Sequence, residues 1–199
     1  MSKKVIANLQ DKYAYIPLFS KLLSEPDEVL RNTSGYKLTP EDFYEQFHKV
    51  LFVTITDLHA EGFTKIGKFE INSYLKDNFT QQYATYKEEG GDEYIDRVLK
   101  IDKDEDNFEY YYSRVKKFSL LRHYTSVGID VSDIYDTEED EPSLLTEMNT
   151  LFNKMTILDV VKHIDSKIID IKTEFVVDKE GNGGKLSDNI RDIFRKKKL

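Results

Sequence analysis

The segment TPEDFYEQFHKVLFVTITDLHAEG, Thr39 to Gly62, carries a start signal, an apolar face and a stop signal for one long helix. Thr39 is a favourable N-cap, Pro40 suits the first helical position, and Asp42 stands at the reciprocal position of a capping box. Gly62 supplies the left-handed conformation that commonly ends helices. The apolar positions recur at helical spacing and are Phe43, Phe47, Leu51, Ile55 and Leu58. A helix of about 22 residues is roughly 33 Å long, so other elements are expected to pack across it.

Shorter helices are predicted on both sides of this segment, and no long strand is evident. Pro17 should interrupt a helix that runs from Val5, which places the main turn of the first helix at Pro17 to Ser24. Asp27 to Arg31 is expected to be a short turn. The helices expected after Gly62 are Lys68–Leu75, Asn78–Glu89 and one that opens at Asp92, after the break at Gly90 and Gly91.

Composition limits the class of protein. The 199 residues are 39% hydrophobic, which is too rich for general disorder, and they include no cysteine. The missing cysteines exclude a disulfide framework, a thiolate metal site and a cysteine nucleophile, and they indicate a reducing, cytoplasmic compartment. No apolar run is long enough for a membrane span. A net charge of -8 argues against broad, nonspecific binding of this polypeptide to nucleic acid.

The second half of the chain is predicted to be helical around an acidic linker. A helix that starts at Phe108 and has Gly128 past its end should bury Phe108, Tyr111, Val115, Phe118 and Leu121. Residues 130–142 contain DIYDTEEDE, in which six of nine residues are acidic, and indicate a solvated linker. Ser143 to Met155 is predicted to be an amphipathic helix. Thr156 should cap the next helix, with Asp159 at the capping-box position.

This last helix shows a heptad-like apolar pattern. Its seam positions are Ile157, Val161, Ile164, Ile168, Ile171 and Phe175. Such a seam requires a partner helix, either within the chain as a helical hairpin or in another molecule. Together with Tyr111, Val115 and Phe118 of the preceding aromatic helix, these positions form the predicted oligomer or partner interface.

The motifs that suggest chemistry fail on inspection. EGNGGKLS resembles a phosphate-binding loop, but Lys179 stands where the Walker pattern needs glycine and Leu186 where it needs Ser or Thr. DKDEDN resembles a calcium loop, but Asn107 replaces its glycine and Ser113 its final glutamate. The four histidines show no metal-ligand spacing. No catalytic, metal or cofactor residue is therefore predicted.

The predicted organisation is all-α, with a helical globular domain over residues 1–105 and an extended helical hairpin region over 106–177 that contains the acidic linker. Residues 178–199 are expected to form a flexible hinge and the start of a linker. The chain ends at RKKKL with neither a capping glycine nor a polar tail, which suggests a cut inside a longer protein.

These features are similar to the N-terminal domain of hexameric replicative DNA helicases of the DnaB type, especially phage or mobile-element versions. The matching positions are Leu22, Leu23, Pro26, Asp42, Phe43, Tyr44, His48, Leu51, Phe52, Leu58, Gly62, Gly90, Gly91, Tyr94, Tyr112, Leu120, Leu121 and Arg122. GIDVSDIYD and the segment from Thr156 to Phe175 resemble the family's following segments. Pro17 and Phe19 depart from the family's acidic residue and glycine.

The resemblance implies a non-catalytic collar that pairs through its helical extensions and contacts primase or a helicase loader. It implies that ATP and magnesium bind a motor domain that is missing here, that no cofactor binds this chain, and that DNA is contacted only by the full-length ring. The alternatives are a stand-alone helical adaptor protein with no attached helicase, and an enzyme whose carboxylates no motif marks. A Walker signature downstream would favour the helicase over the adaptor.

Overall fold

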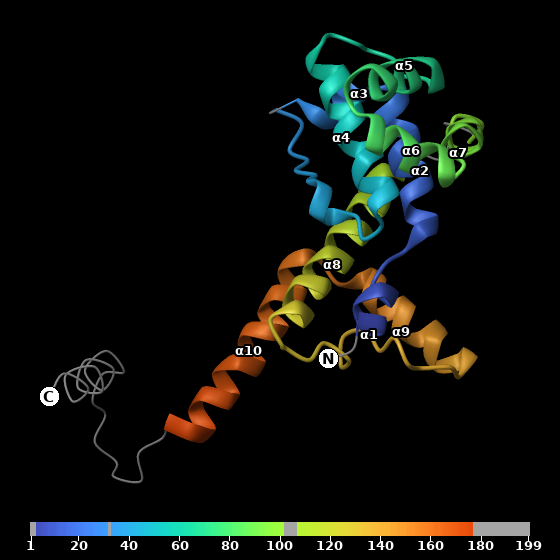
Figure 1. Ribbon diagram of the computed structural model, residues 1–199. Helices are drawn as coiled ribbons and strands as arrows, with labels where there is room; N and C mark the ends of the chain where they lie inside the picture. Colours follow the sequence, from blue (N-terminus) through green and yellow to red (C-terminus); the bar gives the residue numbers. More distant parts are fainter. Residues whose placement is uncertain (1–2, 32, 102–106, 177–199) are drawn as a thin grey trace, which may run out of the picture. The chain divides into compact units, whose positions relative to one another are not determined.

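The computed structural model of the protein describes residues 3–31, 33–101 and 107–176, and describes side chains for 5–31, 33–101 and 107–169 (Figure 1). The backbone of these ranges contains helices and turns without strands, so the predicted all-α class is confirmed. The elements are α1 (Lys3–Asn8), α2 (Lys12–Ser24), α3 (Pro26–Leu30), η1 (Pro40–Asp42), α4 (Gln46–Ala60), α5 (Lys68–Asn78), α6 (Thr80–Glu88), α7 (Gly91–Val98), α8 (Phe108–Ser126), α9 (Pro142–Lys154) and α10 (Ile157–Val176). The chain divides into two compact units, Met1–Val161 and Lys162–Leu199.

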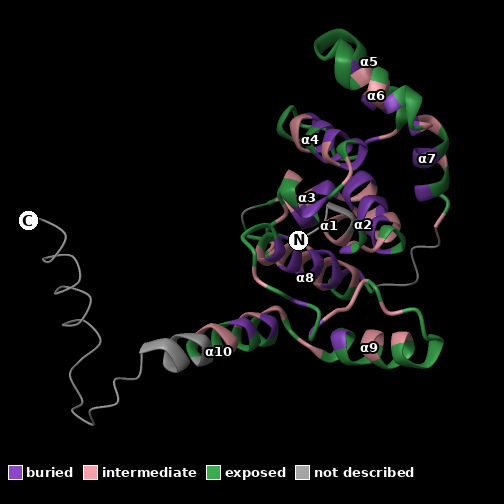
Figure 2. Cartoon of the chain, turned by 60° about the horizontal axis from the view of Figure 1, so that its bottom comes forward, coloured by how far each residue is buried: buried purple, intermediate pink, exposed green. Residues whose placement is uncertain are grey.

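The core of the first unit is built on α2, α4 and α8, whose buried positions stand out in Figure 2. The predicted apolar face of the segment from Thr39 to Gly62 is buried at every position. Phe43 lies at the centre, with its ring centroid 5.3 Å from that of Tyr15 and 5.1 Å from that of Phe19. Burying one such ring stabilises the fold by about 1.5–3 kcal/mol, so this face does organise the unit.

The prediction of a single long helix from Thr39 to Gly62 is wrong, because the helical conformation is interrupted after Asp42. Pro40–Asp42 form the 3-10 turn η1, Phe43 is extended with φ -105° and ψ 137°, and α4 begins only at Gln46. The Asp42 arm of the predicted capping box is present, since Asp42 Oδ2 accepts from Thr39 N at 2.8 Å. The same carboxylate pairs with Lys116 Nζ at 2.8 Å. This contact with α8 holds η1 in place, and the extended Phe43 then reaches the core.

The start of α2 also differs from the prediction. Asp11 caps this helix, because its Oδ1 accepts from Tyr13 N at 2.9 Å and from Ala14 N at 3.2 Å. The helix then continues through Pro17 to Ser24. The predicted start at Pro17 is therefore wrong: the N-terminal cap and the buried side chains of the helix outweigh one missing backbone donor. The predicted turn at Asp27 to Arg31 is mostly helix α3, which has Pro26 at its first position.

Helix α8 is part of the first unit and makes its most extensive contacts with α2. Phe108 and Val115 belong to the same buried core as the side chains of α2 and α4. The structure divides the chain after Val161, and the predicted domain boundary after residue 105 stays a prediction. The apolar face of α8 helps to close the core.

The acidic stretch 130–142 is only partly the solvated linker that was predicted. Val131 and Ile134 are buried within it. The Tyr135 ring packs between Phe118 and Phe152, at centroid distances of 4.9 and 5.0 Å. Its apolar residues thus anchor the stretch, while Glu138, Asp140 and Glu141 remain exposed.

Helix α10 begins in the first unit and continues into the second. The predicted capping box is confirmed: Thr156 N donates to Asp159 Oδ2 at 2.9 Å, and Asp159 N donates to Thr156 Oγ1 at 3.1 Å. The predicted hinge over residues 178–199 lies outside the described residues. Along the described helices, none has both the length and the apolar character that a bilayer crossing requires. A cytoplasmic location stays a prediction.

Candidate functional site

Three cations of α8, namely Arg114, Lys117 and Arg122, are buried in the protein. They lie beside Phe118 and Leu121 on the face that sequence periodicity identified as apolar. A buried positive charge is stable only when it is paired or hydrogen-bonded. The acceptors of these three side chains therefore show what α8 holds together.

Arg122 connects α8 to two distant loops. Its Nη1 donates to the Leu9 carbonyl at 2.7 Å, and its Nη2 donates to the carbonyls of Asp42 at 2.7 Å and Glu41 at 3.2 Å. Burial lowers the pKa of Arg122, but a guanidinium stays charged in proteins. Arg122 thereby fixes the η1 turn and the segment between α1 and α2 against the same helix.

Arg114 attaches α9 to the globular core. Its Nη2 donates to Asn149 Oδ1 at 2.9 Å, and its Nη1 donates to Asn153 Oδ1. Its Nε pairs with Asp11, the residue that caps α2. One guanidinium thus joins α8, α9 and the N-terminus of α2.

Lys117 binds the C-terminal end of α9. Its Nζ donates to the carbonyl of Phe152 and, at 2.9 Å, to that of Met155, at the C-terminal end of α9. The ammonium lies 4.5 Å from the centroid of the Phe152 ring. Cations favour helix C-termini because the last carbonyls are unpaired. Burial, with Arg114 nearby, lowers the pKa of Lys117 to about 8.

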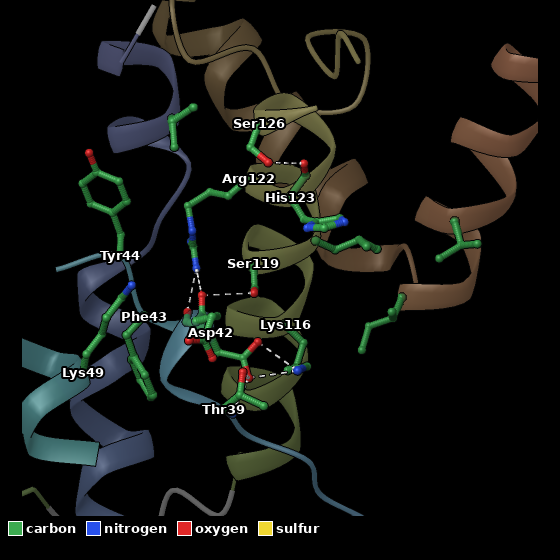
Figure 3. Close-up of a pocket in the computed structure, with 15 residues that line it drawn as sticks. Thr39, Asp42, Phe43, Tyr44, Lys49, Lys116, Ser119, Arg122, His123 and Ser126 are labelled. Atoms are coloured by element: carbon green, nitrogen blue, oxygen red, sulfur yellow. Dashed lines mark hydrogen bonds and ion pairs between the residues drawn. The ribbon is translucent and has the colours of Figure 1, made fainter. Parts of the chain in front are cut away.

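A groove of about 640 Å³ opens beside Arg122, between η1, α8 and the first turn of α10 (Figure 3). Its apolar lining includes Phe43, Leu120 and Val161. Two of its cations are occupied, since Lys116 pairs with Asp42 and Arg122 binds backbone carbonyls. Lys49 lines the same groove and makes no ion pair with any residue of the described ranges.

A second hollow of about 240 Å³ lies between α4, α5 and α6. It is lined by Val50, Val53, Leu75 and Phe79 together with Lys49. Lys49 is thus shared by the two hollows. This part of the surface offers recesses with apolar side chains on both sides of a lysine that makes no ion pair within the described residues.

The nine predicted interface residues fall into three groups. Val115 and Phe118 are buried in the core of this chain, and Tyr111 is half-buried against it. On α10, Ile164 is fully buried, whereas Ile157, Val161 and Ile168 are half-buried. Ile157 and Val161 line the groove. The side chains of Ile171 and Phe175 lie outside the described residues. The interface itself stays a prediction.

Sequence reasoning missed the three buried cations, Lys49 and the two asparagines of α9. Nothing in the local pattern distinguishes Lys117 from the exposed lysines around it. The one available signal was Arg122, which is among the positions that resemble the helicase family. In the described part of the chain, no group of three or more His, Asp and Glu side chains is placed to hold a metal ion.

A family model described as the DnaB-like helicase N terminal domain matches residues 18–117, which is half of the chain. The chain belongs to this family. The match runs from α2 into α8 and includes η1 and α4, so it covers the core described above. The resemblance inferred from the sequence is confirmed.

A similar protein is the SPbeta prophage-derived uncharacterized protein YorI of Bacillus subtilis (strain 168). It is 35% identical over 186 residues, which cover 94% of this chain and 36% of YorI. The chain therefore spans little more than a third of the length of this relative, and the similarity extends beyond the family match at Lys117. No solved structure matches the chain.

Proposed function

We propose that this chain is a non-catalytic collar domain of a DnaB-type replicative helicase, which pairs with other copies and presents a surface to primase or to a helicase loader. In this proposal, ATP and magnesium bind a separate motor domain, and DNA is contacted by the assembled ring. The family match and the relative of greater length support it.

The observation that carries the proposal is the exposure of apolar side chains on the last two helices. Leu144 and Leu151 of α9 are 43% and 57% exposed, and Leu158 and Ile169 of α10 are 57% and 59% exposed. In the described part of α9, only Phe152 is fully buried. Single exposed apolar residues are ordinary, but four on two consecutive helices indicate a surface that another molecule covers.

Sedimentation velocity over a range of concentrations tests the pairing. Ile164→Asp is unsuitable because Ile164 is fully buried and a charge there would destabilise the fold. Leu158→Asp combined with Ile169→Asp is suitable, since both side chains are more than half exposed. The two residues are eleven positions apart, which is close to three helical turns, so they lie on one face of α10. We expect wild type to self-associate and the double variant to bind at least about tenfold more weakly.

Phe69→Asp is the matched control, because Phe69 is an exposed apolar residue on α5. Its association should equal that of wild type. A wild-type chain that stays monomeric at the highest concentration would refute the pairing. Primase and loader contacts are tested separately, by titrating each purified partner against the full chain.

A further inference from the structure

Helix α9 presents a stripe of three exposed side chains, Leu144, Glu147 and Leu151. Spacings of three and four place them on one face, about 10.5 Å from end to end at 1.5 Å per residue. The helix docks on its own chain through Phe152 and the two asparagines that bind Arg114. At about 100° per residue, the stripe lies on the opposite side of α9 and faces away from its own chain.

The receiving surface has the same order of chemistry. The groove lined by Phe43, Leu120 and Val161 and the hollow lined by Val53 and Phe79 share Lys49. Acidic residues also line both hollows, namely Glu41 and Asp42 in the groove and Asp57 in the second hollow, and Asp42 is paired with Lys116. Lys49 is the lining cation that makes no ion pair within the described residues, and the apolar side chains on its two sides match a leucine, a glutamate and a leucine.

Charge favours this match over an arbitrary contact. Copies of a chain with a net charge of -8 repel one another unless opposite charges meet at the contact. The residues before α9 include the exposed Glu138, Asp140 and Glu141, so the segment that precedes the stripe is acidic. Lys49 offers the opposite charge without first breaking an ion pair within the described residues.

We propose that the Leu144, Glu147 and Leu151 stripe of one copy docks on the two hollows of a second copy, with Glu147 against Lys49. This rests on the proposed function, since it specifies how copies of the collar domain meet. The two surfaces differ, so the contact is head-to-tail and leads to a closed ring or to an open chain of copies.

A charge-reversal cycle tests the pairing of Lys49 with Glu147. Lys49→Glu and Glu147→Lys are each expected to weaken self-association about tenfold at low salt, because each places like charges at the contact. The chain that carries both changes should associate within about twofold of wild type, because the pair is restored with its charges exchanged. Lys76→Glu and Glu109→Lys, alone and together, are matched controls on exposed positions outside both hollows, and should leave association unchanged.

Crosslinking gives a second measurement, since the chain has no native cysteine. Lys49→Cys and Glu147→Cys chains are mixed and treated with a short bismaleimide. We expect a covalent dimer in the mixture, and much less dimer when either variant is treated alone.

The outcomes separate this inference from the proposed function. If wild type associates and Leu158→Asp with Ile169→Asp prevents it, but the charge cycle and the mixed crosslink show no effect, the docking inference is wrong and collar pairing stands. If wild type is monomeric throughout, both are wrong. If the fold loss of association in the doubly reversed chain equals the product of the losses in the two single variants, Lys49 and Glu147 do not contact each other.

Discussion

Replacing Lys117 with methionine should change how the stability of the protein depends on pH. Lys117 is 2% exposed, and its pKa is lowered from 10.5 to about 8, first by burial and then by Arg114. Between these two values the unfolded chain binds a proton that the folded chain releases. Stability from this group is therefore lowest below pH 8 and rises as the pH increases towards 10.5.

The magnitude follows from the shift. A difference of 2.5 pKa units corresponds to about 3 kcal/mol, and about 2 kcal/mol of this is recovered between pH 7 and pH 9.5. The two carbonyl acceptors and the Phe152 ring stabilise the ammonium and offset part of the burial cost, so these are upper values. Methionine has a similar length and no charge. At pH 7, Lys117→Met loses these contacts, which lowers stability, and removes a buried charge, which raises stability. The two effects should nearly cancel, so the free energy of unfolding of Lys117→Met should be within about 1 kcal/mol of that of wild type.

Urea unfolding of both chains, followed by circular dichroism at pH 7 and pH 9.5, measures the effect. Wild type should gain up to about 2 kcal/mol relative to Lys117→Met over this interval. The interval stops at pH 9.5 because burial raises the pKa of Tyr86 and Tyr94, so that ionisation of these tyrosines in the unfolded state lowers stability at higher pH.

Lys76→Met is the control, since Lys76 is exposed on α5 and its loss should leave the pH dependence of wild type unchanged. A difference between wild type and Lys117→Met that stays constant from pH 7 to pH 9.5 would refute the reasoning. It would mean that the pKa of Lys117 is not lowered in the folded state, because the carbonyl acceptors and the Phe152 ring offset the cost of burying the ammonium in full.

Three further perturbations address other parts of the first unit. Burial lowers the pKa of His48 from 6.5 to about 4, so between these values the unfolded chain binds a proton that the folded chain does not. Acidification from pH 7 to pH 5 should therefore lower the free energy of unfolding by about 2 kcal/mol more in wild type than in His48→Phe, as measured by urea unfolding. Arg122→Met removes the hydrogen bonds that Arg122 donates to three backbone carbonyls and should lower stability by about 3 kcal/mol, measured by the same assay. Arg122→Lys should recover only part of the loss. Gly91→Ala would place a Cβ 2.2 Å from the Tyr86 ring and should lower stability by about 2 kcal/mol or more, whereas Gly35→Ala meets no atom within 4 Å and should show only the smaller strain of its left-handed backbone.

The buried cations bear on the proposed function because they determine which part of α9 is available. Arg114 binds the asparagines of α9 and Lys117 binds its terminal carbonyls, and the centroid of the Phe152 ring lies 5.8 Å from Arg114 Cζ and 4.5 Å from Lys117 Nζ. The leucine and glutamate stripe is part of the surface of α9 that stays exposed. The contacts that hold this helix on its own chain thus also orient the surface that we propose for a second copy.

Local sequence patterns were sufficient for the helical class and for several helix ends. Thr156 and Asp159 form the predicted capping box, and Gly62 and Gly128 take the left-handed conformation expected after α4 and α8. These features depend on residues three or four positions apart, so a linear pattern contains them. The family, too, was recognisable from the spacing of core residues.

Contacts between distant residues decided the rest. Arg122 donates to a carbonyl 113 positions away, and Lys117 donates to one 35 positions away. Lys116 binds the carboxylate of Asp42, 74 positions away, at the turn that stands where the long helix was predicted to start. From the sequence alone, a charged residue next to an apolar helix face is predicted to lie on the surface. Its burial can be predicted only once its hydrogen-bond acceptors are known, because these acceptors stabilise the buried charge. The amino-acid sequence by itself therefore determined an all-α chain of the DnaB-like N-terminal family, and the tertiary structure alone decided where the helices break, how α9 is held and which side chains are left for a partner.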